Sequence, residues 1–259
     1  MASLFDTFSA VTWAIAFAVA FLAGLIKGTV GFGMPMIMIS GLGSVMAPEA
    51  ALAGLLIPTL VSNGWQALRQ GVWAALGSMN RFRRFLISGG VVLVFAAQLV
   101  PYLPAFALLL LIGVPVSLYA VATLFGGGLR LPPDPGPGVQ TGVGVVAGFF
   151  GGITGVWGPP TVAMLTAMGT SKTDQMRVQG VIYGLGALAL VGAHIASGVL
   201  RAETLPLSLS ITLPALLGMA AGFRMQDRMD QAMFRRMTLF VLLIGGLNLI
   251  RKGLGLGLF

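Results

Sequence analysis

The sequence predicts an all-α, polytopic membrane protein built from two inverted repeats of five segments, and three observations lead to this fold class. Only 8% of the 259 residues are charged and 57% are hydrophobic, whereas soluble domains carry roughly a quarter charged residues. Long uncharged runs recur along the chain, and a Gly/Pro-rich motif interrupts an apolar run once in each half. So little charge cannot cover a globular surface, which excludes a soluble enzyme and a disordered chain.

The composition also limits the chemistry. The chain has no cysteine, one histidine and seven acidic residues, so we expect no metal site and no cofactor. No helix interior offers a nucleophile with its base, and no GxxxxGK[ST] phosphate loop occurs; we therefore expect no enzyme and no ATP-driven pump. The net charge of +8 comes from positive residues in short loops, which is typical of membrane orientation. The expected partner at this point is the lipid bilayer, and not nucleic acid.

The first half, residues 1–128, is predicted to form one transmembrane repeat. Its uncharged runs have the length that helical membrane segments need, about 20 residues for a full span. The long run after Arg84 is divided by PYLP at 101–104, because proline ends or kinks a helix. The predicted segments are 9–27, 34–46, 49–69, 83–101 and 105–125.

The second half, residues 139–259, comes after a Pro/Gly linker at 129–138 and forms the second predicted repeat. Its segments are 139–151, 158–169, 176–197, 204–223 and 233–251. In each half the first two segments form a short hairpin that Gly and Pro interrupt. The hairpin either crosses the membrane fully or re-enters near the midplane, and both alternatives leave the downstream topology unchanged.

The chain repeats itself at the interruption. A shift of 124 residues places AGLIKGTVGFGMP (23–35) on AGFFGGITGVWGP (147–159). The identical pairs are Ala23/Ala147, Gly24/Gly148, Gly28/Gly152, Gly31/Gly155 and Pro35/Pro159. Two related halves are a common transporter architecture.

The positive residues predict that the two halves are inverted. With Lys27 set aside, ten segments place eleven positive residues on one side and three on the other, and the richer side is cytoplasmic. The eleven are Arg69, Arg81, Arg83, Arg84, Arg130, Lys172, Arg177, Arg224, Arg228, Arg235 and Arg236, and the three are Arg201, Arg251 and Lys252. Both termini are then outside the cytoplasm.

The paired interruptions are the predicted substrate site. A helix break frees backbone N–H groups that lipid cannot satisfy, and the helix after the break directs its positive dipole end toward it. The candidates are Gly28, Thr29, Gly31, Phe32, Gly33 and Pro35 in the first half, and Gly152, Thr154, Gly155, Trp157, Gly158 and Pro159 in the second. For any single glycine, the alternative is close helix packing.

Several polar side chains add to this site or compete with it. Lys27 is the only charged residue between Asp6 and Glu49; it either meets the charge of an anionic substrate or snorkels to the cytoplasmic surface. Asn63 and Gln66 share one helix face, which favours a polar pathway over interhelical hydrogen bonding. Gln179 and Tyr183 form an i,i+4 pair, for which interhelical hydrogen bonding is the favoured interpretation.

His194 is the candidate for proton coupling, because it is the only histidine and titrates near neutral pH. It lies in the last turn of its segment, so an interfacial histidine without a transport role is the favoured alternative. No carboxylate lies in the interior of a predicted span. Transport is coupled to protons through His194, through Lys27 or through protonation of the substrate, or it is not coupled at all. The sequence leaves these alternatives open.

A glycine-rich break followed by Pro occurs in both halves. A later helix in each half has scattered polar residues and ends in LRQG (68–71) or HIASG (194–198). These motifs resemble those of the TauE/SafE sulfite exporter family, also called TSUP. The resemblance covers nearly the whole chain. It implies transport of sulfite, sulfoacetate or other organosulfonates across the bacterial inner membrane. The family's Gly/Pro motif maps to residues already named at both breaks, and its polar residue maps to Asn63. The chain departs from the family at 181–184, where a Thr-Ser-like element is usual.

Together these features predict a secondary membrane transporter of a small sulfur-containing anion, sulfite or an organosulfonate, that works by alternating access around two opposed helix breaks. The alternative is a channel-like passive anion pore, because facing helix dipoles also suit a selectivity filter. The expected location is the bacterial inner membrane, with many crossings and both termini periplasmic. A homodimer stays open as a further partner.

Overall fold

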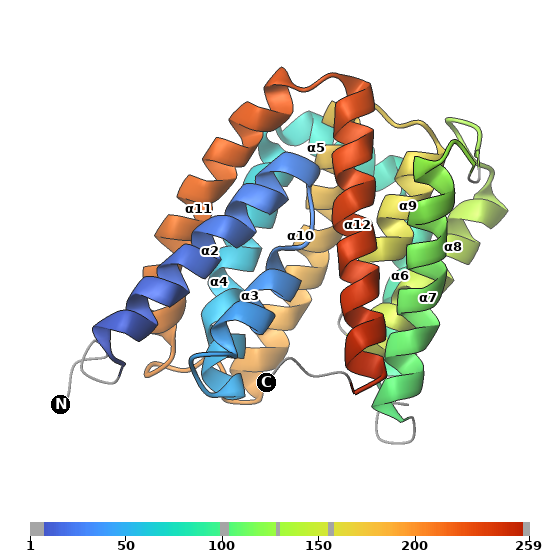
Figure 1. The fold of residues 1–259 in the computed structure, drawn as a ribbon. Helices are drawn as coiled ribbons and strands as arrows, with labels where there is room; N and C mark the ends of the chain where they lie inside the picture. Colours follow the sequence, from blue (N-terminus) through green and yellow to red (C-terminus); the bar gives the residue numbers. More distant parts are fainter. Residues whose placement is uncertain (1–7, 99–103, 128–129, 155–157, 256–259) are drawn as a thin grey trace. The chain divides into compact units, whose positions relative to one another are not determined.

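The computed structural model describes residues 8–98, 104–127, 130–154 and 158–255, and this part of the chain is all-helical (Figure 1). The described helices are α2 (Ala10–Val30), α3 (Met34–Leu42), α4 (Pro48–Leu68), α5 (Val72–Arg81), α6 (Arg83–Ala97), α7 (Ala105–Leu124), α8 (Pro137–Thr154), α9 (Gly158–Ala167), α10 (Lys172–Ala196), α11 (Leu205–Arg228) and α12 (Gln231–Gly253). Four of them, α2, α10, α11 and α12, are long and apolar enough to cross a membrane, and α7 contains a shorter apolar stretch.

The ten predicted segments each coincide with a helix, and one helix was not predicted. This is α5, a short helix in the basic stretch between two predicted segments. On it Trp73 is exposed and Ser78 is buried. Such a helix has no long apolar run, because its polar and apolar residues lie on different faces and therefore mix along the sequence. A search for uncharged runs therefore passes over it.

The helices form two compact units, and neither unit is one half of the sequence. Unit 1 comprises Met1–Ala75 and Met176–Met229, and unit 2 comprises Leu76–Gln175 and Asp230–Phe259. Unit 1 thus combines α2, α3 and α4 with α11 and most of α10, while unit 2 combines α6 and α7 with α8, α9 and α12. Each unit takes helices from both predicted repeats. The inverted relation of the repeats stays a prediction.

The core of unit 1 is a cluster of small and medium apolar side chains. The members at the centre include Ala16 and Ala20 of α2, Met38 of α3, Leu56 of α4 and Ile211 of α11, each fully buried. Helices α2 and α11 lie side by side (Figure 1). Their backbones touch, because a Cβ at Gly24 or Gly28 would collide with a carbonyl oxygen of α11 and a Cβ at Gly218 or Gly222 with one of α2. These are small-xxx-small contacts.

Helix α4 contains Pro58, which cannot donate the hydrogen bond that Gly54 O would otherwise accept. Ser208 of α11 fills this gap. Its hydroxyl donates to Gly54 O at 3.0 Å and accepts from Ile57 N at 3.1 Å. A proline inside this helix is therefore tolerated because the neighbouring helix supplies the missing partner.

Ion pairs join α4 to the α11 region at both ends of α4. Glu49 lies 2.7 Å from Arg201, just before α11, and Arg69 lies 2.5 Å from Asp227 near the end of α11. Arg69 also stacks over the ring of Phe223, 4.3 Å from its centroid. Because both helices begin near one pair and end near the other, α4 and α11 run parallel.

Unit 2 uses the same kind of contact in two helix pairs. A Cβ at Gly148 of α8 would collide with Gly89 O of α6, and one at Gly144 would meet Phe85 O at 2.7 Å. Helices α7 and α12 meet at Gly113 and Gly246, where a Cβ at Gly113 would lie 2.8 Å from Gly246 O. Figure 1 shows α7 and α12 side by side.

Candidate functional site

The turn between α2 and α3 lies where the first Gly/Pro break is predicted. Helix α2 ends at Val30, and α3 begins at Met34. Gly31 and Gly33 have φ angles of +91° and +94°, a region that favours glycine. Pro35 lies in the first turn of α3, where its missing N–H costs nothing. Phe32 between the two glycines is buried.

Helix α3 starts inside the protein without a side-chain cap. Its N-cap residue is Gly33, whose carbonyl accepts from Ile37 N at 3.1 Å. The first N–H groups of a helix have no partner within the helix and carry the positive end of its dipole. The turn therefore directs positive partial charge into the interior of unit 1, as the sequence predicts.

Lys27 lies one turn before the end of α2 and is 1% exposed. Its ammonium donates to Asn63 Oδ1 of α4. Among the described residues no carboxylate forms an ion pair with Lys27. This burial favours the first of the two alternatives over snorkelling, since Lys27 lies inside unit 1 with a neutral amide as its one described partner; its role in substrate binding stays a prediction. A buried charge of this kind is costly unless an anion compensates it.

A stripe of buried polar residues on α4 faces this turn. Gln66 Nε2 donates to Gly31 O at 3.0 Å and to Met176 O at 2.8 Å, and Asn63 Nδ2 donates to Tyr183 O at 3.2 Å. The carbonyl partners fix the orientation of both amides. Asn63 and Gln66 share one face of α4 and both bind the backbone of α10, which is the interhelical hydrogen bonding that the sequence disfavoured; a polar pathway stays a prediction.

Gln179 of α10 joins the same cluster, although its sequence pattern indicated interhelical hydrogen bonding. Its side chain is fully buried, and in the described part of the chain neither Nε2 nor Oε1 has a hydrogen-bond partner. Its Oε1 lies against Gly31, where a Cβ would collide with it. Gln66 Oε1 is also without a partner among the described atoms. Buried amide atoms are rarely left unpaired in proteins.

Two predicted site residues have other roles. Thr29 donates its hydroxyl to Leu25 O at 2.8 Å, within its own helix. Gly28 packs against Met219 and Gly222 of α11, as the packing alternative expects. The polar cluster thus consists of Lys27, Asn63, Gln66, Gln179 and the Gly31–Gly33 turn, all in unit 1.

The second predicted break lies in unit 2 and is described in part. Gly155 and Trp157 lie outside the described residues, as does the side chain of Thr154. Gly152 is in the last turn of α8, and Gly158 and Pro159 begin α9. Pro159 is buried. The duplication of the break therefore stays a prediction.

His194 lies two residues before the end of α10 and is part-exposed. Its Nδ1 is buried and has no hydrogen-bond partner among the described atoms. Its backbone carbonyl accepts from Leu200 N at 2.9 Å, within the turn that ends the helix. None of its described contacts involves the polar cluster, and its role in coupling stays a prediction.

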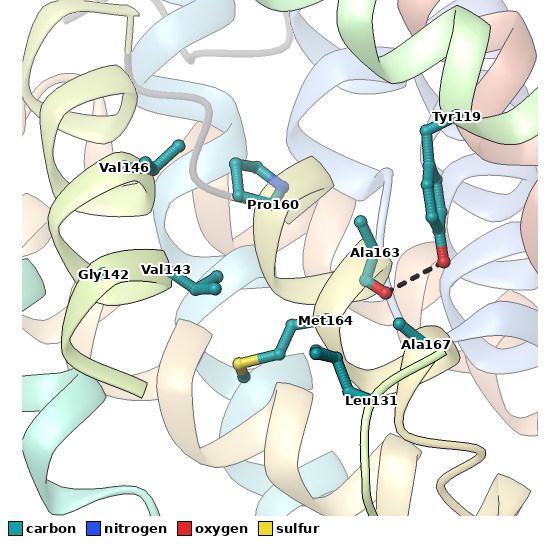
Figure 2. A pocket seen from close by; sticks show the side chains of 9 residues that line it. All are labelled: Tyr119, Leu131, Gly142, Val143, Val146, Pro160, Ala163, Met164 and Ala167. Atoms are coloured by element: carbon teal, nitrogen blue, oxygen red, sulfur yellow. Dashed lines mark hydrogen bonds between the residues drawn. The ribbon is translucent and has the colours of Figure 1, made fainter. Parts of the chain in front are cut away.

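Unit 2 contains a cavity of about 250 Å³ that the sequence did not predict. Its lining is almost wholly apolar, as Figure 2 shows. The one hydroxyl, that of Tyr119, already donates to Ala163 O at 3.0 Å. The lining residues are Tyr119, Leu131, Gly142, Val143, Val146, Pro160, Ala163, Met164 and Ala167. This cavity carries no charge that could hold an anion.

The chain was compared with known protein families. The family described as Sulfite exporter TauE/SafE matches residues 16–249, nearly the whole chain, from α2 to α12. The resemblance predicted from the Gly/Pro motifs is thereby confirmed. No curated protein and no solved structure matches the chain.

Proposed function

Because the chain belongs to the TauE/SafE sulfite exporter family, we propose that it is a secondary transporter of sulfite or an organosulfonate that works by alternating access. The family and the apolar helices make it a multi-pass membrane protein. The energy source is an ion gradient or the gradient of the substrate, because the sequence has no phosphate-binding loop.

One observation carries the proposal: a lysine that is 1% exposed and has only a neutral amide partner among the described residues. An ammonium in such surroundings has lost its hydration and gained one hydrogen bond. An anion supplies the missing charge, and the uncapped start of α3 adds backbone N–H donors. These are the two kinds of group that recognise a small oxyanion.

The second break is the proposed counterpart on the other side of the membrane. There Gly152, Thr154, Gly155, Trp157, Gly158 and Pro159 take the positions of the first break. Alternating access then exposes the anion to one side at a time. In this proposal the protein lies in the bacterial inner membrane with both termini in the periplasm. The proposal does not depend on whether two copies form a homodimer.

Flux in proteoliposomes tests the transporter against the passive pore. Vesicles loaded with unlabelled sulfite are diluted into labelled sulfite. A carrier accumulates label transiently above equilibrium by counterflow, and its rate saturates with sulfite. A pore equilibrates the label without overshoot, which would contradict alternating access. Absence of flux both with sulfite and with an organosulfonate such as sulfoacetate would contradict the proposed function itself.

Cysteine labelling tests the orientation, because the chain has no cysteine of its own. Trp73 on α5 and Leu254 after α12 are both exposed. We expect Trp73→Cys to react with an impermeant maleimide from the cytoplasmic side and Leu254→Cys from the periplasmic side. Labelling of both positions from one side would contradict the proposed topology.

A further inference from the structure

We propose that the polar cluster selects a singly charged oxyanion that carries its own hydroxyl group, such as hydrogensulfite, and that Gln66 and Gln179 together determine this choice. The inference rests on the proposed function and names the chemical form of the substrate. It depends on which polar atoms of the cluster are already paired and which are not.

The cluster has one positive charge and, in the part of the chain that the structure describes, no negative one. Lys27 Nζ has a single described partner, Asn63 Oδ1, although an ammonium has three hydrogens to donate. One buried positive charge balances one negative charge. A dianion would keep one uncompensated charge away from water, which is costly. The charge therefore favours a monoanion.

The two glutamines add unpaired acceptors. Both hydrogens of Gln66 Nε2 are used, since this atom donates to Gly31 O and Met176 O. Its Oε1 can then only accept, and it has no donor among the described residues. Gln179 offers two unpaired donor hydrogens on Nε2 and a second unpaired acceptor, Oε1, within the same described part of the chain.

The two amides lie at the same turn. Gln66 binds the carbonyl of Gly31, and Gln179 Oε1 occupies the space that a Cβ of Gly31 would need. Glycine at this position thus permits both the left-handed backbone and the buried amide beside it. Both side chains are at most 1% exposed, so bulk water does not satisfy them.

A ligand that fits these atoms needs a negative charge for Lys27 and at least one hydrogen-bond donor for the glutamine oxygens. Hydrogensulfite has both, because one of its oxygens carries a proton. A sulfonate group has the charge but no O–H, so it leaves the acceptors unpaired. Leaving a buried acceptor unpaired is more costly than the mean value of a hydrogen bond suggests. The cluster should therefore prefer hydrogensulfite.

The test compares hydrogensulfite with chlorate at mildly acidic pH. Both are pyramidal monoanions with three oxygens, and only hydrogensulfite can donate. We expect the purified full-length protein to bind hydrogensulfite about tenfold more tightly than chlorate in calorimetry. This factor is the effect on affinity of one further buried acceptor that gains a hydrogen bond. Methylphosphonate monoanion against methanesulfonate repeats the comparison with a methyl group in both probes. Equal affinities within both pairs would overturn the proposal.

Gln179→Leu assigns part of the preference to this residue. The change removes no hydrogen bond among the described atoms, so we expect the variant to unfold at or above the wild-type temperature without anion. Its preference for hydrogensulfite over chlorate should shrink, because Gln66 Oε1 is then the one glutamine oxygen of the cluster left to accept from the hydroxyl. A lower unfolding temperature together with an unchanged preference would overturn the assignment and support interhelical hydrogen bonding by Gln179.

Gln140→Leu is the matched control, a buried glutamine of α8 in unit 2. It should keep the preference for hydrogensulfite. Loss of the preference in the control would overturn the role of Gln179. The flux assay separates this inference from the proposed function: sulfite counterflow with equal binding of both anions refutes only the selection, whereas no sulfite binding and no flux refutes both.

Discussion

Helices α2 and α11 of unit 1 meet backbone to backbone at Gly24 and Gly218, and helices α6 and α8 of unit 2 do so at Gly89 and Gly148. The two pairs differ in the residue one turn further along the chain. Three residues after Gly24, α2 places the buried charge of Lys27. Three residues after Gly148, at the position aligned with Lys27, α8 has Gly151.

Packing and recognition are therefore separate properties of these helices. Glycines at equivalent positions allow close approach in both units, so they mark architecture. The buried charge is what differs: unit 1 buries the ammonium of Lys27, while the buried unpaired polar atoms described in unit 2 are hydroxyls and one amide, and its cavity is apolar. Within the described residues, the buried positive charge therefore lies in unit 1. Substitutions in both units can test how far they are alike and where they differ.

Folding should respond most strongly. Gly24→Val in unit 1 and Gly148→Val in unit 2 each place a branched side chain against a carbonyl oxygen of the neighbouring helix. We expect each to cost more than about 4 kcal/mol and to abolish folded protein, measured by fluorescence-detected size exclusion. Gly64→Ala, which has open space around it, should fold normally. If Gly148→Val folds like wild type, the two helix pairs are not packed alike.

Anion affinity should show the next strongest response. Lys27→Met removes a charge-assisted hydrogen bond worth about 1.5–3 kcal/mol, so sulfite affinity should fall by about 10- to 150-fold. Lys27→Arg keeps the charge in another shape and should retain part of it. Calorimetry measures both, with Lys252→Met at the exposed end of α12 as control. Unchanged affinity in Lys27→Met would mean that the backbone N–H groups of α3, and not Lys27, bind the anion.

A third prediction concerns the stability of unit 1. Ser208→Ala leaves Gly54 O and Ile57 N without their bridging hydroxyl beside Pro58. We expect a loss of about 2 kcal/mol, seen as a lower unfolding temperature. In the Pro58→Ala background helix α4 can make its own hydrogen bond, so the same change should cost less. Equal losses in both backgrounds would mean that Ser208 does not compensate the proline.

The apolar cavity of unit 2 should respond least. Tyr119→Phe removes the hydrogen bond to Ala163 O but keeps the ring (Figure 2). We expect about 1 kcal/mol lower stability and unchanged sulfite affinity. Thermal unfolding and calorimetry on the same sample check both. A drop in affinity comparable to that of Lys27→Met would remove the chemical difference between the units.

Local sequence was enough to predict the helices and the turn between α2 and α3. Both depend on local chemistry: apolar runs have the length of membrane segments, and Gly31, Gly33 and Pro35 have backbone requirements that can be read in place. It also identified Lys27 as the residue to explain, because a charge inside an apolar run is rare. Helix α5 escaped the same reasoning, since its amphipathic pattern contains no long run.

The pairing of the polar groups, in contrast, depends on how the helices pack. Gln66 meets Met176, and Asn63 meets Tyr183, across 110 and 120 residues of chain, a separation at which no local pattern sets the geometry. The same packing placed Gly28 against α11 and left Gln179 unpaired at the turn among the described residues. Residue types reveal which atoms need partners, but burial decides which of them go without, because an amide stays unsatisfied only where the fold excludes water.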